Sequence, residues 1–128
     1  MAEPLIFINT YRIKDGQFEG FRDATPEWLE FVEANNPRIL HFGAYIDEDR
    51  AEATTVQVHP DAASLELQTK VVAGRLHEWQ KFAEWEGMTV VICGIPTDPL
   101  VEQMKQIAGS GVAVTVKTPV GSFTRLPG

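Results

Sequence analysis

The chain has 128 residues, of which 44% are hydrophobic and 23% charged, with a net charge of −7 and a single cysteine. This length fits one domain with a real core. The acidic balance argues against nucleic acid as a partner, because phosphate binding needs clustered Lys and Arg. Cys93 alone excludes an internal disulfide and a multi-cysteine metal site. No apolar run approaches the ~18 residues of a membrane span, and the N-terminus lacks a signal-peptide pattern, so we expect a cytoplasmic protein without a membrane partner.

Residues 5–14 are rich in β-branched and aromatic side chains and predict the first strand. Both of its faces are apolar at the start, which indicates a strand covered on both sides. A helical pattern then runs from Phe18 to Asn35. Thr25 and Pro26 interrupt it and predict a kink or a restart there, because proline inside a helix costs ~3 kcal/mol and little in a first turn.

Residues 38–46 and 52–59 predict two strands joined by a short polar link, which favours an antiparallel hairpin. A helix is expected over about 62–85, because apolar residues recur there at helical spacing. Residues 88–96 predict a fourth strand. The resulting order, β-α-β-β-α-β, is the ferredoxin-like arrangement of the α+β class.

A tail follows this unit. Asp98 is a good N-cap and Pro99 a good first helical residue. Glycines at 109 and 111 stop that helix, and residues 112–117 alternate as a last strand. We expect residues 1–97 to form the barrel domain and 98–128 a helix-strand extension packed on the same domain. The last strand should extend a sheet edge, either of its own subunit or of a partner.

The corner "VQVHPDAASLELQTK" joins the third strand to the long helix. Pro60 enforces a turn after His59, and Asp61 or Ser64 caps the helix. Gln68 is an anomaly, because it stands where the helical pattern asks for an apolar residue. It either finds hydrogen-bond partners in the backbone or in Arg75, or it lines a pocket. The three histidines have no ligand-like spacing, so no metal site is expected.

With this element order, "DGQFEGF" entering the first helix and "HPDAASLEL" at the corner, residues 4–96 resemble the antibiotic-biosynthesis-monooxygenase-like family. The tail resembles that of its extended members. The resemblance implies a dimeric α+β barrel with a pocket between helices and sheet in each subunit. The best-known members oxidise polycyclic phenols or quinols with O2 and use neither metal nor flavin. Relatives carry histidine where Gln68 stands, which puts any role of that histidine in doubt here.

The resemblance favours a cofactor-independent monooxygenase that oxidises a small aromatic phenol or quinol with O2. The alternatives are a non-catalytic dimeric barrel that binds a small apolar ligand, and a haem-binding or haem-degrading relative. A homodimer through the sheets is expected, because "LIFI" and "VVICGI" are apolar on both faces. No cofactor is expected.

Asn9 interrupts the first strand where family members often carry a functional Asn, and His41 could be a base. An ordinary satisfied core amide and strand histidine are the alternatives. These two are the candidate catalytic residues, and the candidate substrate-binding residues are Tyr11, Tyr45, Gln68, Arg75 and Trp79. They share a pocket only if their faces point to the same side of the sheet, which the sequence leaves open.

Overall fold

The computed structural model describes residues 4–109 and 111–125. In chain order the elements are β1 (Leu5–Ile13), α1 (Phe18–Asn35), β2 (His41–Asp47), β3 (Glu52–His59), α2 (Ala62–Ala73), α3 (Leu76–Trp79), β4 (Ala83–Cys93), α4 (Asp98–Ala108) and β5 (Ala113–Lys117). The strands form one sheet in the order β2-β3-β1-β4-β5. Its first four strands pair antiparallel, and β5 pairs parallel to β4. This is the predicted α+β arrangement with its helix-strand extension.

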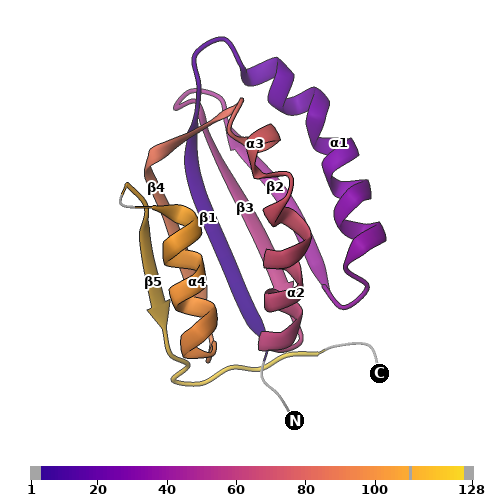
Figure 1. Ribbon diagram of the computed structural model, residues 1–128, viewed down its shortest axis with the longest axis vertical. Helices are drawn as coiled ribbons and strands as arrows, with labels where there is room; N and C mark the ends of the chain where they lie inside the picture. The colour runs from indigo at the N-terminus through magenta and orange to yellow at the C-terminus, as the bar shows by residue number, and fades with distance from the viewer. Residues whose placement is uncertain (1–3, 110, 126–128) are drawn as a thin grey trace.

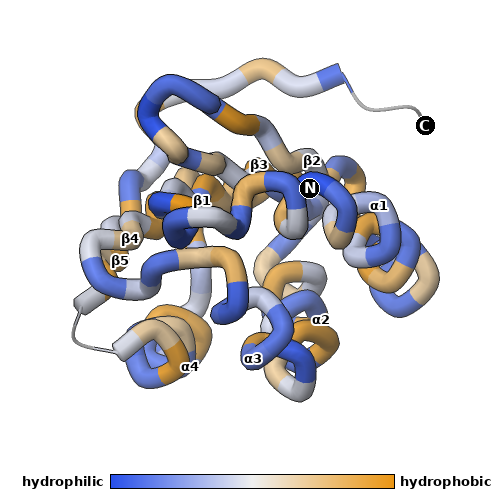
Figure 2. Tube along the Cα trace, turned by 90° about the horizontal axis from the view of Figure 1, so that it is seen from above, coloured by the Kyte–Doolittle hydropathy of each residue, from blue (hydrophilic) through white to orange (hydrophobic). Residues whose placement is uncertain are grey.

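All four helices lie on one face of the sheet (Figures 1 and 2). The face of β1 that carries Leu5, Tyr11 and Ile13 is buried beneath them, as the two-residue period predicts. No described helix or strand covers the other face of the sheet. Figure 2 shows the segment after β5 crossing on that side. The predicted cover on both sides of β1 is therefore not supplied by this chain alone.

The first helix is unbroken, so the predicted restart at Pro26 is wrong. Pro26 lies inside α1, well past its first turn. The Thr25 hydroxyl donates a hydrogen bond of 2.7 Å to the carbonyl of Phe21, one turn back. The helix holds because Trp28 and Val32, beyond the proline, are buried against the sheet, and tertiary burial of this kind overrides the local preference.

The prediction of one helix over 62–85 is also wrong. The observed helix α2 ends at Ala73, and the single turn α3 follows it. Residues 83–85, expected in the helix, begin β4, which starts five residues before the predicted strand. The backbone explains this. Lys14 N–H bonds the carbonyl of Phe82 at 2.7 Å, and Ala83 pairs with Ile13. These long-range pairings decide the conformation of a segment whose apolar spacing also suits a helix.

The tail packs on the sheet as predicted. Leu100 and Met104 of α4 are buried in a core cluster with Leu5, Leu65 and Ile92. The helix is capped by Thr97, whose hydroxyl accepts from the N–H of Leu100, one residue earlier than expected. The last strand extends the sheet of its own subunit, beside β4. No described helix is both long and apolar enough to cross a membrane.

Candidate functional site

A cavity of about 140 Å³ lies between the sheet and the helices α2 and α4. Its floor is made by the helix-facing side chains of the sheet, which are Phe7, Asn9, Phe42, Thr55, Gln57, Val90 and Val114. Its roof comes mainly from one side of α2 and one side of α4, namely Leu65, Gln68, Thr69, Val72, Met104, Ile107 and Ala108. The extension therefore supplies part of the wall. An apolar cavity with a few polar groups is the usual form of a small-molecule site.

An irregularity in β4 shapes one end of the cavity. The pairing of β1 with β4 shifts between Thr10 and Arg12, which face Thr89 and Glu84. Because β4 has more residues than β1 over this stretch, it bulges. Trp85 and Met88, three positions apart, both line the cavity as a result, although side chains that far apart on a regular strand point to opposite faces. Bulges often re-aim side chains in this way next to functional sites.

Two amide atoms in the cavity wall lack a hydrogen-bond partner. They are Asn9 Oδ1 and Gln68 Nε2, the only such buried side-chain atoms found among the described residues. One is an acceptor from β1 and the other is a donor from α2. A buried polar atom without a partner costs about 1–3 kcal/mol, and each such group in a folded protein calls for an explanation. A bound molecule that offers one donor and one acceptor would satisfy both.

Gln68 is held in place from the side away from the cavity. Its Oε1 accepts a hydrogen bond of 3.0 Å from Asn36 Nδ2, and Asn36 sits directly after α1. The same Nδ2 contacts the carbonyl of Ser64 at 3.3 Å. Both predicted partners of Gln68, the backbone and Arg75, are thus replaced by Asn36. The oxygen is engaged and the nitrogen is left for the cavity.

A second buried network holds Gln57. His59 Nδ1 lies 2.7 Å from Ser64 Oγ, and His59 Nε2 lies 2.9 Å from Gln57 Oε1. His59 and Ser64 are fully buried. Burial lowers the pKa of His59 to about 4, against a smaller opposing effect of the Asp61 carboxylate, so the imidazole is neutral at pH 7. As predicted, Asp61 caps α2, accepting from the N–H of Ser64 at 3.0 Å.

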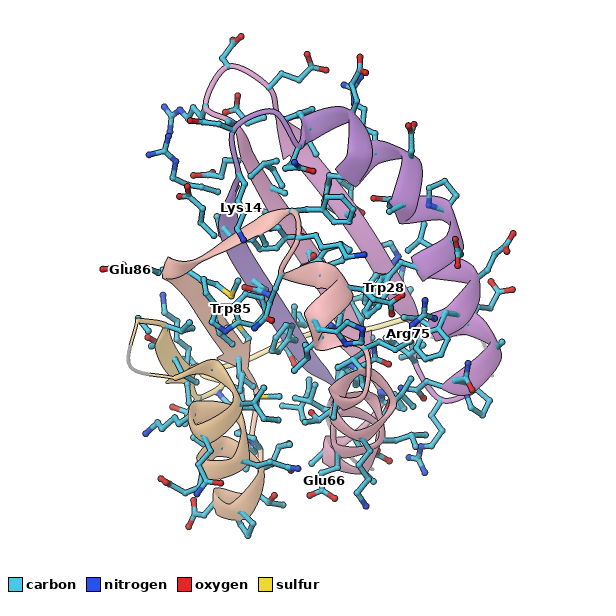
Figure 3. The ribbon with its side chains drawn as sticks, turned by 45° about the horizontal axis from the view of Figure 1, so that its top comes forward. Lys14, Trp28, Glu66, Arg75, Trp85 and Glu86 are labelled. Atoms are coloured by element: carbon cyan, nitrogen blue, oxygen red, sulfur yellow. The ribbon has the colours of Figure 1, made fainter. Side chains whose placement is uncertain are left out.

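Trp79 lines the cavity, and Tyr11 packs behind it. The two rings meet edge to face at 5.9 Å, and Trp79 stacks on Trp28 at 5.2 Å. The Tyr11 hydroxyl lies 3.2 Å from Thr55 Oγ1, and burial raises the pKa of this phenol well above its ordinary value. Figure 3 shows Trp28 and Trp85 approaching the middle of the molecule from opposite sides. Tyr11 is therefore a core residue and does not contact the cavity.

His41 and Tyr45 lie away from the cavity, so their predicted place beside Gln68 is wrong. Their neighbour Phe42 faces the cavity, and by strand alternation His41 and Tyr45 face the other side of the sheet. Both are exposed, and His41 Nε2 lies 3.1 Å from the Tyr45 hydroxyl. Of the predicted site, the structure brings together only Asn9, Gln68 and Trp79.

Arg75 is likewise outside the cavity. Its guanidinium lies over the Phe31 ring, 4.3 Å from the centroid, and forms a two-point ion pair with Glu78. The hydrogen bond to Glu78 raises the pKa of Arg75 and lowers that of Glu78. Figure 3 shows Arg75 beside Trp28, at a second pocket that residues of α1 and α3 line. This surface contact replaces the predicted role in substrate binding.

The cavity wall contains no ionisable side chain among the described residues. Its polar groups are amides, threonine hydroxyls and tryptophan indole N–H groups, and the Thr69 hydroxyl already donates to the carbonyl of Leu65 at 2.9 Å. The site can therefore hold and orient a ligand, but its own side chains offer no strong acid, base or nucleophile. Among the described residues no cluster of His, Cys, Asp and Glu could hold a metal ion.

Sequence reasoning missed Gln57, Trp85 and Met88 as lining residues. Gln57 carried a signal, because it shares one face of β3 with Thr55 and His59, between the apolar neighbours Val56 and Val58. Trp85 carried none, since it was assigned to a helix. The bulge that turns it inward depends on pairing with β1.

Comparison with solved structures identifies the fold of this chain. MupZ from Pseudomonas fluorescens superposes with a TM-score of 0.79 at 16% identity, over 98% of this chain and 91% of that chain. A candidate antibiotic biosynthesis monooxygenase from Bacteroides thetaiotaomicron gives a TM-score of 0.51 at 16% identity, over 77% and 91% of the two chains. The likeness to MupZ includes the helix-strand extension, since it spans nearly the whole chain.

A candidate monooxygenase from Fusobacterium nucleatum is similar over 71% of this chain and 43% of that chain, with a TM-score of 0.64 and 17% identity. The chain thus has the antibiotic-biosynthesis-monooxygenase-like fold, as its sequence resemblance predicted. No protein-family model and no curated protein matches the chain. At such identities the likeness establishes the fold, and the reaction has to be argued from the site.

Proposed function

We propose that the cavity binds a small aromatic phenol or quinol and that the protein oxidises it with O2 without a bound cofactor. The observation that carries this proposal is the pair of unpartnered amide atoms, Asn9 Oδ1 and Gln68 Nε2, in an otherwise apolar cavity. A phenol hydroxyl can donate to the first and accept from the second. A cavity of about 140 Å³ is close to one that holds a single benzene ring, so one-ring substrates fit best.

The chemistry then belongs mainly to the substrate. A phenolate gives one electron to O2, and the resulting phenoxyl radical and superoxide combine through a new C–O bond. Loss of water from the hydroperoxide leaves a quinone, so one phenol and one O2 yield one quinone and one water. The Gln68 N–H stabilises the developing phenolate in a water-poor site, which is the role of a preorganised donor. The proton of the phenol goes to solvent, and a proton from solvent converts the peroxide anion to the hydroperoxide, because no lining side chain can exchange one.

Oxygen consumption by the purified, metal-free protein tests this proposal, with hydroquinone, catechol and a substituted phenol as substrates. Gln68→Leu should lower kcat about 100-fold, the usual loss when one such donor is removed. Asn9→Leu should weaken binding. Gln80→Leu is the matched control, because Gln80 is exposed directly after α3, and it should behave as the wild type. Equal rates in Gln68→Leu and Gln80→Leu would exclude the proposed role of Gln68.

The pH dependence separates substrate ionisation from catalysis by a side chain. We expect the rate to rise with the ionisation of the substrate itself, because no lining group titrates. Two phenols of different acidity should therefore give profiles displaced from each other by the difference between their own pKa values. A common midpoint for both would instead reveal an ionisable group of the protein.

A non-catalytic binding protein is the second candidate, and the absence of an acid, base or nucleophile from the described cavity wall favours it. A ligand that raises the melting temperature without consuming O2 would select this reading. A haem protein with a histidine ligand in the cavity is disfavoured, because His59 is held on both nitrogens while His41 and His77 are exposed. A shifted Soret band on titration with haemin would revive it.

We further propose a homodimer joined through the sheet face that the helices leave open. Ile6 on this face is 36% exposed, and Ile8, Val56, Val58 and Val91 beside it are half-buried. Apolar surfaces of this kind usually mark an interface. Light scattering should give twice the mass of one chain, and Val56→Glu should give single chains at the same concentration. A wild type that is monomeric at micromolar concentration would refute the dimer.

A further inference from the structure

The two glutamines of the cavity are held in the same way by unrelated networks. Gln68 has its Oε1 engaged by Asn36 Nδ2 at 3.0 Å, and Gln57 has its Oε1 engaged by His59 Nε2 at 2.9 Å. Gln68 comes from α2 and Gln57 from β3. Both line the cavity. In each, a buried partner occupies the amide oxygen on the side away from the cavity.

The tautomer of His59 fixes the orientation of Gln57. A neutral imidazole has one N–H and one acceptor nitrogen. Because the Gln57 oxygen can only accept, Nε2 of His59 must carry the proton. Nδ1 is then the acceptor, and it receives the Ser64 hydroxyl proton across 2.7 Å. The chain of donors runs from Ser64 through His59 to Gln57, and it leaves the amide nitrogen of Gln57 for the cavity.

Ser64 is in turn fixed by its backbone at both ends. Its N–H donates to Asp61 Oδ1 at 3.0 Å, and its carbonyl accepts from Asn36 Nδ2 at 3.3 Å. Its side chain is fully buried, as is His59, and neither lines the cavity. A Ser–His pair without access to the cavity cannot serve as nucleophile and base there. Its geometry suits the positioning of a neighbouring group.

The acceptor of the site lies close to these donors. Phe7 pairs with Gln57 and Asn9 with Thr55, so Asn9 and Gln57 are diagonal neighbours on the helix-facing side of the sheet. Diagonal neighbours on adjacent strands are about 7–8 Å apart. One small molecule can therefore reach both side chains. Gln68 reaches the same cavity from the roof.

We propose that Gln57 is a specificity-determining residue, oriented by the positioning residues His59 and Ser64, and that it selects an aromatic ring with a hydroxyl next to a carbonyl. The amide N–H of Gln57 binds the carbonyl oxygen, the amide N–H of Gln68 binds the hydroxyl oxygen, and Asn9 Oδ1 accepts from the hydroxyl alongside the ligand's own carbonyl. This inference rests on the proposed function, because it assumes that the cavity is the ligand site. It narrows the substrate class from phenols in general to ortho-acyl phenols.

A matched pair of ligands tests the selection. 2-Hydroxyacetophenone has the required carbonyl, and 2-ethylphenol has nearly the same shape without it. Calorimetry should show that the wild type binds the ketone about tenfold more tightly, the usual effect of one or two neutral hydrogen bonds. In Gln57→Met the two affinities should become nearly equal, with that of 2-ethylphenol almost unchanged. Gln80→Met, at an exposed position, should keep the preference.

A second variant tests the positioning chain without touching the cavity. Ser64→Ala removes the donor to His59 Nδ1, so the imidazole is free to change tautomer and Gln57 is free to turn. We expect the preference for the ketone to fall severalfold while 2-ethylphenol binds as before. A Ser64→Ala protein that melts at a lower temperature and keeps the full preference would show that Ser64 and His59 are merely structural.

The outcomes separate the two proposals. If the wild type binds neither ligand, the cavity does not take small aromatic molecules, and both proposals fail. If it binds both equally, or if Gln57→Met keeps the tenfold preference, the selection by Gln57 is refuted while the proposed function stands. Only a preference in the wild type that disappears in Gln57→Met and persists in Gln80→Met supports the inference.

Discussion

The buried histidine should make the stability of the protein depend on pH. His59 is fully buried and hydrogen-bonded on both ring nitrogens, and its pKa is lowered from 6.5 to about 4, mainly by burial. Protonation would make both ring nitrogens donors. Nδ1 could then no longer accept the hydrogen bond from the Ser64 hydroxyl. The folded state therefore binds a proton at His59 less readily than the unfolded chain does.

The sign and size follow from this difference. Between pH 6.5 and about 4 the unfolded chain carries a proton on His59 that the folded chain lacks, so falling pH favours unfolding. The stabilisation is complete above about pH 6.5 and is lost progressively down to about pH 4. A lowering from 6.5 to about 4 corresponds to a loss of about 3 kcal/mol. That is a large share of the 5–15 kcal/mol that is typical of whole domains.

Urea unfolding followed by tryptophan fluorescence measures this effect between about pH 7.5 and pH 4.5. Carboxylates also titrate in this range, so the readout is the difference between the wild type and His59→Asn, which cannot titrate. The free energy of unfolding of the wild type should fall by about 2–3 kcal/mol more than that of the variant. His77→Asn, at an exposed position, is the control and should follow the wild type. Parallel curves for the wild type and His59→Asn would refute the reasoning.

Four further substitutions have expected effects on the free energy of unfolding, measured by urea denaturation. Gly94→Ala should lower this free energy by more than about 2 kcal/mol, because φ at Gly94 is +142° and the new Cβ would lie 2.3 Å from Leu5 Cδ2. Gly16→Ala should lower it less, because φ at Gly16 is +78° but nothing lies near the new Cβ. Tyr11→Phe should cost about 1 kcal/mol by removing a buried hydrogen bond. Gly74→Ala should gain up to about 1 kcal/mol, since φ is −74° and nothing lies near the new Cβ; a loss there would contradict this.

The order of strands and helices along the chain was predictable because local sequence patterns indicate most of the elements. β3 alternates buried and half-buried positions over its whole length and β1 alternates at its two ends, and the corner after β3 carries its own cap in Asp61. The stretch from Gly74 to Gly87 was not predictable in this way. Leu76, Trp79 and Ala83 fit a helical stripe, and only hydrogen bonds to a strand some 70 residues earlier in the sequence make part of it a strand.

The two amide residues of the candidate site were predictable for a related reason. Asn9 and Gln68 each interrupt an otherwise apolar face, and such an interruption marks a residue that needs a partner whichever way the element turns. For His41 the prediction needed more, namely which face of β2 lies under the helices. Alternation groups His41 with Tyr45 and separates both from Phe42, but it assigns neither group to a side of the sheet. Only the register of β2 on β3, together with the position of α2, does so.

The position of His41 outside the cavity limits the chemistry that the cavity can support. With His41 on the open face of the sheet, the described cavity wall holds no group that could remove a proton at neutral pH. Oxidation by O2 then requires a substrate that ionises on its own, and the protein contributes by stabilising the anion. The free N–H groups of Gln57 and Gln68 suit that task, because an amide donor binds an oxyanion more strongly than a neutral oxygen. Under the proposed function, a ligand that stays neutral would be bound in this cavity without being oxidised.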